Sequence, residues 1–276
     1  MRVRYSFSSR RTRKLKNIRK QREKFPSLVL KIVANSDIII EVLDARFIKE
    51  TRNLELEEEI TRQGKKIIYV LNKSDIIKKL NKKDMPNLKP HVVVSCKLRK
   101  GIKELRSKIK ELSKKIKNPV GERITIGVIG YPNTGKSSLI NLLIGKSSAG
   151  TGSDAGFTKG IQKLKLTSEI FLLDSPGVIP KKEYSSIKSK LIAGHTKVGA
   201  RSYSQVKEPE IVIATLMQEY KDVIEKHYKI QAKGDSEILL EKLGKKWNYF
   251  KKGGVVNLDK TARRILKDWQ SGEIKV

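Results

Sequence analysis

The chain has 276 residues, in which 61 Lys and Arg side chains outnumber 29 Asp and Glu and give a formal net charge of +32. This charge exceeds what solubility requires and predicts a polyanionic partner. RNA fits better than a membrane, because no apolar run approaches the roughly 20 residues of a spanning helix. The single cysteine, Cys96, excludes a framework of internal disulfides and suits a reducing compartment. We therefore expect a cytoplasmic protein that does not bind membranes.

Residues 1–24 form a basic arm in which Glu23 is the one acidic side chain. We predict that this arm contacts RNA. An organellar transit peptide and a merely solvated helix are the alternatives, since both have similar compositions.

From residue 25 to residue 180, short apolar runs alternate with helical patterns. The predicted strands are Ile38 to Asp44, Lys66 to Leu71, His91 to Val94, Ile124 to Ile129 and Ile170 to Leu173. One predicted helix begins at Ser27. The others span Asn53 to Arg62, Gly101 to Ile116 and Lys136 to Leu143. This alternation predicts an α/β domain whose mainly parallel, doubly wound sheet presents ligand groups at the carboxyl ends of its strands.

The pattern changes in residues 181–276, where no strand is indicated. The predicted helices are Ile187 to Gly199, Ile211 to Tyr228, Ser236 to Lys246 and Leu258 to Trp269. We predict a second, all-helical domain that binds RNA. Its aromatic residues are interpreted as core rather than as a base-stacking surface, because aromatic residues at helical spacing are more often buried. They are Trp247, Tyr249, Phe250 and Trp269.

The stretch from Gly130 to Ser137 satisfies the pattern G-x-x-x-x-G-K-[ST] and lies between a predicted strand and a predicted helix, as a P-loop does. In such a loop, backbone N–H groups hold the phosphates, Lys136 reaches the β- and γ-phosphates, and the Ser137 hydroxyl binds Mg²⁺. A glycine-rich turn without a ligand is the alternative, but it leaves Lys136 without a partner. The predicted phosphate-binding residues are Asn133, Thr134, Gly135, Lys136, Ser137 and Ser138.

Two polar turns that follow buried strands predict the base. The Asp75 carboxylate can accept the N1 and N2 protons of guanine, which adenine does not offer in that arrangement. The aliphatic stem of Lys73 covers the ring, and the Cys96 N–H is expected to meet guanine O6. Asn72 is expected to pack against the P-loop. The predicted base-reading residues are Asn72, Lys73, Asp75, Ser95, Cys96 and Lys97.

A third motif follows the predicted strand that ends at Leu173. Asp174 and Gly177 have the spacing of a DxxG switch, in which the carboxylate holds Mg²⁺ through water and the glycine N–H meets the γ-phosphate. Thr158 lies between the P-loop and this switch and can supply a second hydroxyl to Mg²⁺. Loss of the γ-phosphate would release both loops. A plain connection from strand to turn is the alternative.

The base-reading turns precede the P-loop, whereas an ordinary small GTPase has them last. This order, together with Asp44-Ala45-Arg46 and Arg52-Asn53, resembles the circularly permuted GTPases of the YlqF/YawG type, which are assembly factors of the large ribosomal subunit. The resemblance is strong over residues 20–180. It implies GTP as substrate, Mg²⁺, a K⁺ ion held partly by Asn133, and contact of the carboxyl-terminal end with ribosomal RNA.

The catalytic arrangement departs from two patterns. Val178 stands where Ras-like enzymes carry a water-orienting glutamine, which indicates slow intrinsic hydrolysis. The histidine that bacterial members place near the amino terminus is missing here, and His195 is interpreted as structural or RNA-facing. The residues expected to take part in catalysis are Asn133, Lys136, Thr158 and Gly177.

These features predict a monomeric GTPase that ribosomal RNA and K⁺ stimulate and that acts on the large ribosomal subunit or its precursor. Two alternatives remain. One is an RNA-binding module that senses GTP with negligible turnover, and the other is a GTPase directed at tRNA.

Overall fold

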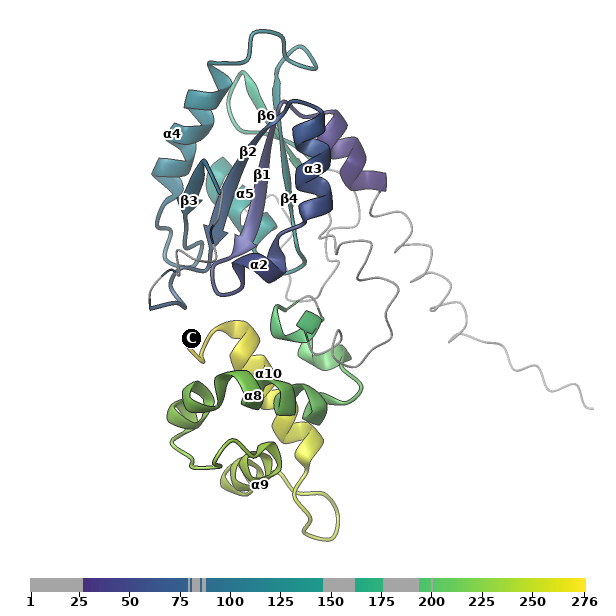
Figure 1. Cartoon of the computed structure of the whole chain (residues 1–276), viewed down its shortest axis with the longest axis vertical. Helices are drawn as coiled ribbons and strands as arrows, with labels where there is room; N and C mark the ends of the chain where they lie inside the picture. The colour runs from purple at the N-terminus through teal and green to yellow at the C-terminus, as the bar shows by residue number, and fades with distance from the viewer. Residues whose placement is uncertain are drawn as a thin grey trace, which may run out of the picture.

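The computed structural model describes residues 27–78, 80, 85, 88–145, 162–175, 194–199 and 201–276. In these residues a six-stranded sheet has the order β3-β2-β1-β4-β6-β5 (Figure 1). The strands are β1 (Ile38–Asp44), β2 (Lys66–Asn72), β3 (His91–Val93), β4 (Ile124–Gly130), β5 (Gln162–Lys165) and β6 (Ile170–Asp174). All neighbours pair in parallel except β5, which is antiparallel to β6. The predicted mainly parallel sheet is confirmed.

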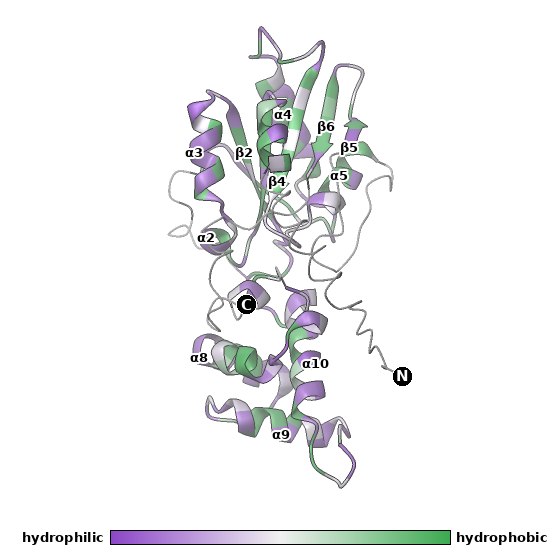
Figure 2. Cartoon of the chain, turned by 90° about the vertical axis from the view of Figure 1, so that its right-hand side faces the viewer, coloured by the Kyte–Doolittle hydropathy of each residue, from purple (hydrophilic) through white to green (hydrophobic). Residues whose placement is uncertain are grey.

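Helices cover both faces of this sheet. The helices are 27–34, α2 (Ile48–Thr51), α3 (Leu54–Arg62), α4 (Ile102–Ser113) and α5 (Lys136–Ile144). Alternate residues of β1 face opposite sides, so Ile40 packs with α4 and α5, whereas Ile39 packs with α3 and helix 27–34. Figure 2 shows hydrophobic residues concentrated in the strands and hydrophilic residues over most of α3. This two-sided burial explains the continuous apolar runs.

The described part of the chain after residue 194 is helical, with α8 (Pro209–Tyr228), α9 (Ser236–Lys246) and α10 (Leu258–Ser271) around one core. A short 3-10 helix, η2 (Tyr203–Gln205), precedes α8. The predicted helix from Ile187 to Gly199 is described only from residue 194, where 194–197 are helical. Phe47 and Tyr131 of the sheet domain also join the helical core. The boundary at residue 180 and the arm 1–24 lie outside the described residues and stay predictions.

The 3-10 helix η2, helix α2 and strand β5 were not predicted. Helix α2 is a single turn of four residues, too short to show a period. Strand β5 has the sequence Gln-Lys-Leu-Lys, in which Leu164 is the one apolar residue, and it pairs only at the sheet edge. Edge strands that carry lysines lack the apolar pattern of a buried strand. Within the described residues, no helix combines the length and the apolar character that a membrane span needs.

The prediction that the four aromatic residues are core is confirmed for Trp269, which is 0% exposed. Trp247 and Tyr249 are half-buried. The prediction is wrong for Phe250, which is 47% exposed. The physical reason is that α9 ends at Lys246, and Phe250 pairs with Val256 in a short antiparallel bridge where helical spacing no longer applies.

Truncating Trp269 to alanine is expected to destabilise the helical domain by about 3–5 kcal/mol, because a large ring leaves a cavity that its neighbours fill poorly. Urea unfolding followed by circular dichroism measures the effect. Phe250→Ala is the matched control, and its free energy of unfolding should stay within about 0.5 kcal/mol of the wild type. Equal midpoints for the two variants would contradict the assigned core.

Candidate nucleotide-binding site

The P-loop follows β4 and leads into α5, as its sequence predicts. Gly130 and Gly135 have φ angles of 146° and 98°, a conformation that residues with a Cβ rarely adopt. A Cβ at Gly130 would lie 2.4 Å from the Val42 carbonyl oxygen, and one at Gly135 would lie 2.3 Å from Asn72 Nδ2. Helix α5 starts at Lys136, directly after Gly135, so its first N–H groups point into the loop and suit an anion.

Lys136 is buried beneath this loop. Its Nζ donates to the carbonyl oxygens of Gly130 (3.1 Å) and Tyr131 (2.8 Å). Burial lowers the pKa of Lys136 to about 8, although the nearby Asp174 carboxylate opposes the shift. A phosphate group would supply the negative charge that stabilises the ammonium form.

Nucleotide binding at pH about 8.5 is expected to take up protons, because phosphates should raise the depressed pKa of Lys136 back above that pH. Affinity should accordingly fall as the pH rises through about 8. Calorimetric titration with GDP in two buffers of different ionisation enthalpy measures the uptake. The uptake should be smaller at pH about 7, where Lys136 is already mostly charged. Zero uptake at both values of pH would contradict the assignment.

Asn72 ties the predicted base-reading turns to the P-loop. Its Nδ2 donates to the Thr134 carbonyl oxygen over 2.8 Å, and its Oδ1 accepts from the Cys96 N–H over 3.1 Å. The side chain is 2% exposed. The predicted packing of Asn72 on the P-loop is therefore present. The Cys96 N–H, expected to meet guanine O6, has Asn72 as its acceptor in the structure, so the contact with O6 stays a prediction.

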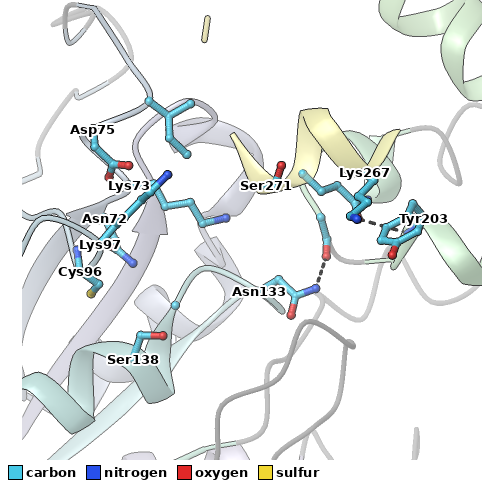
Figure 3. A pocket seen from close by; sticks show the side chains of 14 residues that line it. Asn72, Lys73, Asp75, Cys96, Lys97, Asn133, Ser138, Tyr203, Lys267 and Ser271 are labelled. Carbon is cyan, nitrogen blue, oxygen red and sulfur yellow. Dashed lines mark hydrogen bonds between the residues drawn. The ribbon is translucent and has the colours of Figure 1, made fainter. Parts of the chain in front are cut away.

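Asp75 and the second turn lie side by side. Ser95 Oγ donates to Asp75 Oδ1 over 2.6 Å and accepts from the Leu98 N–H over 3.0 Å. These bonds orient the Asp75 carboxylate at a cavity of about 530 Å³. Figure 3 shows the side chains that surround this cavity. The predicted site residues that line it are Asn72, Lys73, Asp75, Cys96, Lys97, Asn133, Gly135 and Ser138.

Lys73 contacts the Asp-Ala-Arg motif. Its Nζ lies 2.8 Å from Asp44 Oδ2, and the Arg46 guanidinium donates to both oxygens of the same carboxylate. Burial by itself would raise the pKa of Asp44, but the charges of Lys73 and Arg46 outweigh it and hold that pKa well below the usual range. The motif therefore anchors the lysine that was expected to cover the base.

Ser137 and Asp174 form the candidate metal site. Ser137 Oγ donates to Asp174 Oδ2 over 3.4 Å. Asp174 Oδ1 is buried and has no hydrogen-bond partner among the residues that the structure describes. Burial raises the pKa of Asp174, whereas Lys136 and Ser137 oppose the shift. A hydroxyl and an unsatisfied carboxylate oxygen fit Mg²⁺, which binds few protein ligands beside phosphates. Thr158 and Gly177 lie outside the described residues.

Asn133, the predicted K⁺ ligand, donates from Nδ2 to the Gly199 carbonyl oxygen over 2.7 Å. The P-loop thus contacts the helical part of the chain directly.

His195 is 7% exposed, and its ring meets that of Tyr131 edge to face with the ring centroids 6.3 Å apart. This burial favours the interpretation of His195 as a structural residue.

One side of the cavity was not predicted from the sequence. The residues that line this side are Gly199, Tyr203, Lys267, Gln270 and Ser271, together with Ile76 from the predicted base-reading turn. No motif marks these residues, and α10 follows the P-loop by more than a hundred positions. Contacts of this kind depend on tertiary packing that a local pattern does not encode.

The fold and the order of its motifs define a P-loop GTPase domain that is circularly permuted, followed by a helical region. A family model described as "50S ribosome-binding GTPase" matches residues 125–242, which begin within β4 just before the P-loop.

Relatives and solved structures agree with this class. An uncharacterized GTP-binding protein of Methanocaldococcus jannaschii is 38% identical over 250 residues, which cover 90% of this chain and 65% of the relative. Nucleolar GTP-binding protein 2 of Yarrowia lipolytica is 33% identical over 257 residues, which cover 88% of this chain and 48% of the relative. The chain thus spans less than two thirds of the first relative and about half of the second.

The crystal structure of GNP-bound YlqF from T. maritima has a TM-score of 0.64 and 22% sequence identity, and the match covers 91% of this chain and 94% of that one. The GDP-bound structure has a TM-score of 0.58 at 22% identity, covering 86% and 91%. These likenesses show a shared fold. Together with the relatives, they confirm the resemblance to the circularly permuted GTPases of the YlqF/YawG type.

Proposed function

We propose that the protein binds GTP with Mg²⁺, hydrolyses it slowly, and acts in assembly of the large ribosomal subunit through ribosomal RNA. The observation that carries the proposal is the position of Asp75, Asn72 and the P-loop around one cavity. An acceptor for the guanine edge and a cradle for phosphates then lie within reach of a single nucleotide.

The residues have distinct roles in this proposal. Asp75 reads the base, while Lys136 and the first N–H groups of α5 hold the phosphates. Ser137 and Asp174 would hold Mg²⁺, which neutralises phosphate charge when bound. Thr158 would supply a second hydroxyl to Mg²⁺, and the Gly177 N–H would meet the γ-phosphate. The Asn133 side-chain oxygen could join a K⁺ site while its Nδ2 still donates to Gly199, since an amide accepts at one atom and donates at the other.

The ribosomal partner is supported by the description of the family model, by the names of the nucleolar relatives and by the charge of +32. Positive charge of this size suits RNA phosphates, and the resulting affinity should weaken as salt rises. The same proposal includes the RNA contact of arm 1–24, a helical domain over 181–276, a monomeric state and a cytoplasmic location.

Sedimentation with purified large ribosomal subunits tests the proposal. The protein should pellet with subunits in the presence of a non-hydrolysable GTP analogue and remain in the supernatant with GDP. Absence from the subunit fraction with both nucleotides would overturn the ribosomal part. Crosslinking that recovers tRNA instead of large-subunit RNA would favour the tRNA-directed alternative.

A GTP-sensing module with negligible turnover is the second candidate. Val178 and the missing amino-terminal histidine favour it, because both changes remove groups that position water. Hydrolysis that stays at background in K⁺ with ribosomal particles present would select this candidate.

A further inference from the structure

The end of α10 borders the cavity that the base-reading turns and the P-loop form. Lys267, Gln270 and Ser271 of α10 line the same space as Asp75 and Asn133. In Figure 3, Lys267 and Ser271 lie across the cavity from Asp75. A nucleotide bound between Asp75 and the P-loop would therefore meet the helical region on its other side.

Direct contacts fix the end of α10 in this place. Arg46 Nη1 donates to the Trp269 carbonyl oxygen over 2.9 Å, and the Trp269 ring stacks on Phe47 with centroids 6.0 Å apart. Gly272, which ends α10 with a φ of 79°, packs so closely on Ile76 that a Cβ there would lie 2.2 Å from Ile76 Cδ1. Ile76 is the neighbour of Asp75 in the chain, so α10 rests on the base-reading turn itself.

The same contacts lead back to the lysine of that turn. Arg46 shares the buried Asp44 carboxylate with Lys73, whose side chain lines the cavity. A single chain of charged hydrogen bonds thus joins Lys73, Asp44, Arg46 and the Trp269 carbonyl. Asp44 and the Arg46 side chain are almost fully buried. If α10 moved away, the buried Arg46 guanidinium would lose the Trp269 carbonyl oxygen as its acceptor.

Lys267 is the cation that α10 presents at the cavity. Its side chain is exposed, and no salt bridge joins it to a carboxylate within the described part of the chain. Asn133, Gly135 and Ser138, which belong to the phosphate-binding loop, line the same cavity. An ammonium group that lines the same cavity as a P-loop suits the phosphates of the bound nucleotide.

We propose that the end of α10 is a wall of the nucleotide site and that Lys267 contacts the phosphates, so that the nucleotide leaves when this wall moves away. The inference rests on the proposed function, because it needs a guanine nucleotide in the cavity. It assigns nucleotide binding to residues of the helical region and makes the position of that region a determinant of nucleotide release.

Release of a fluorescent GDP analogue, followed by stopped flow, tests the role of Lys267. Lys267→Gln should release the analogue about 10-fold faster than the wild type, because it loses one contact with a charged partner. Lys267→Arg should restore most of the effect. Lys245→Gln, on the exposed side of α9, is the matched control and should leave the rate unchanged. The difference between Lys267→Gln and wild type should shrink at about 1 M salt, where such contacts are screened.

Gly272→Ala tests the wall independently of charge. The added Cβ would collide with Ile76 and push α10 outward, so release should become faster in a way that salt does not change. Gly253→Ala is the control, because Gly253 also has a positive φ, of 90°, but within the part of the chain that the structure describes no atom lies within 4 Å of an added Cβ.

The outcomes separate the inference from the proposed function. Tight GDP binding with wild-type release rates in Lys267→Gln and Gly272→Ala would overturn the inference and leave the proposed function intact. Absence of guanine-nucleotide binding by the wild-type protein would overturn both.

Discussion

Replacing Asp75 with asparagine is expected to lower the affinity for GDP by about 100- to 1000-fold and to raise the affinity for XDP. Guanine presents two donors, N1–H and the 2-amino group, to the Asp75 carboxylate, and bonds to a charged acceptor contribute about 1.5–3 kcal/mol each. Asparagine places a donor where one of these acceptors was. Xanthine carries a carbonyl oxygen in place of the amino group and therefore fits the changed pair.

The fold should tolerate this substitution. Asp75 Oδ1 accepts from Ser95 Oγ, and an asparagine oxygen can accept the same bond. Calorimetric titrations of both proteins with GDP and XDP measure the exchange of specificity, and unchanged circular dichroism serves as the control for folding. Equal GDP affinity in the two proteins would show that Asp75 does not read the base.

Gly135→Ala is expected to weaken nucleotide binding by at least about 30-fold. The φ of 98° strains any residue with a Cβ, at about 1–3 kcal/mol, and the new Cβ would displace Asn72 Nδ2 from the Thr134 carbonyl oxygen. Loss of that buried bond adds about 1–3 kcal/mol. Asn72 also accepts from the Cys96 N–H, so one methyl group disturbs the P-loop and both base-reading turns.

Gly145→Ala is the matched control for this variant. Gly145 ends the same helix, α5, with a φ of 75°, but no atom of the described residues lies within 4 Å of an added Cβ. The Gly145→Ala variant should therefore lose folding free energy only through backbone strain. Its affinity for GDP, measured by equilibrium titration, should equal that of the wild type. If both variants bound GDP alike, the contact between Asn72 and the P-loop would have no role in binding.

The sequence predicted those parts of the candidate site that lie at the ends of strands with a clear local pattern. Asn72 ends β2, Gly130 ends β4 and Asp174 ends β6. The parallel register of these strands brings the three residues together at the carboxyl ends of the strands. Apolar β-branched runs mark such strands clearly, so the positions of their polar ends follow from the pattern.

The parts that the sequence did not predict depend on packing between distant segments. Nothing near Lys267 or Gly272 indicates that α10 rests on the turn around Ile76, because that contact depends on shape complementarity between elements that lie far apart in the chain. The bond from Asn133 to Gly199 is of the same kind. The prediction that Phe250 belongs to the core was wrong because α9 ends at Lys246, and helical spacing no longer applies at residue 250.

The most direct test of the proposed function is the rate of GTP hydrolysis by the full-length protein in K⁺ and in Na⁺, with and without purified large ribosomal subunits. The proposed function predicts a slow basal rate that rises with K⁺ and rises further with subunits. A rate that responds to neither would contradict the assignment as a ribosome-assembly GTPase.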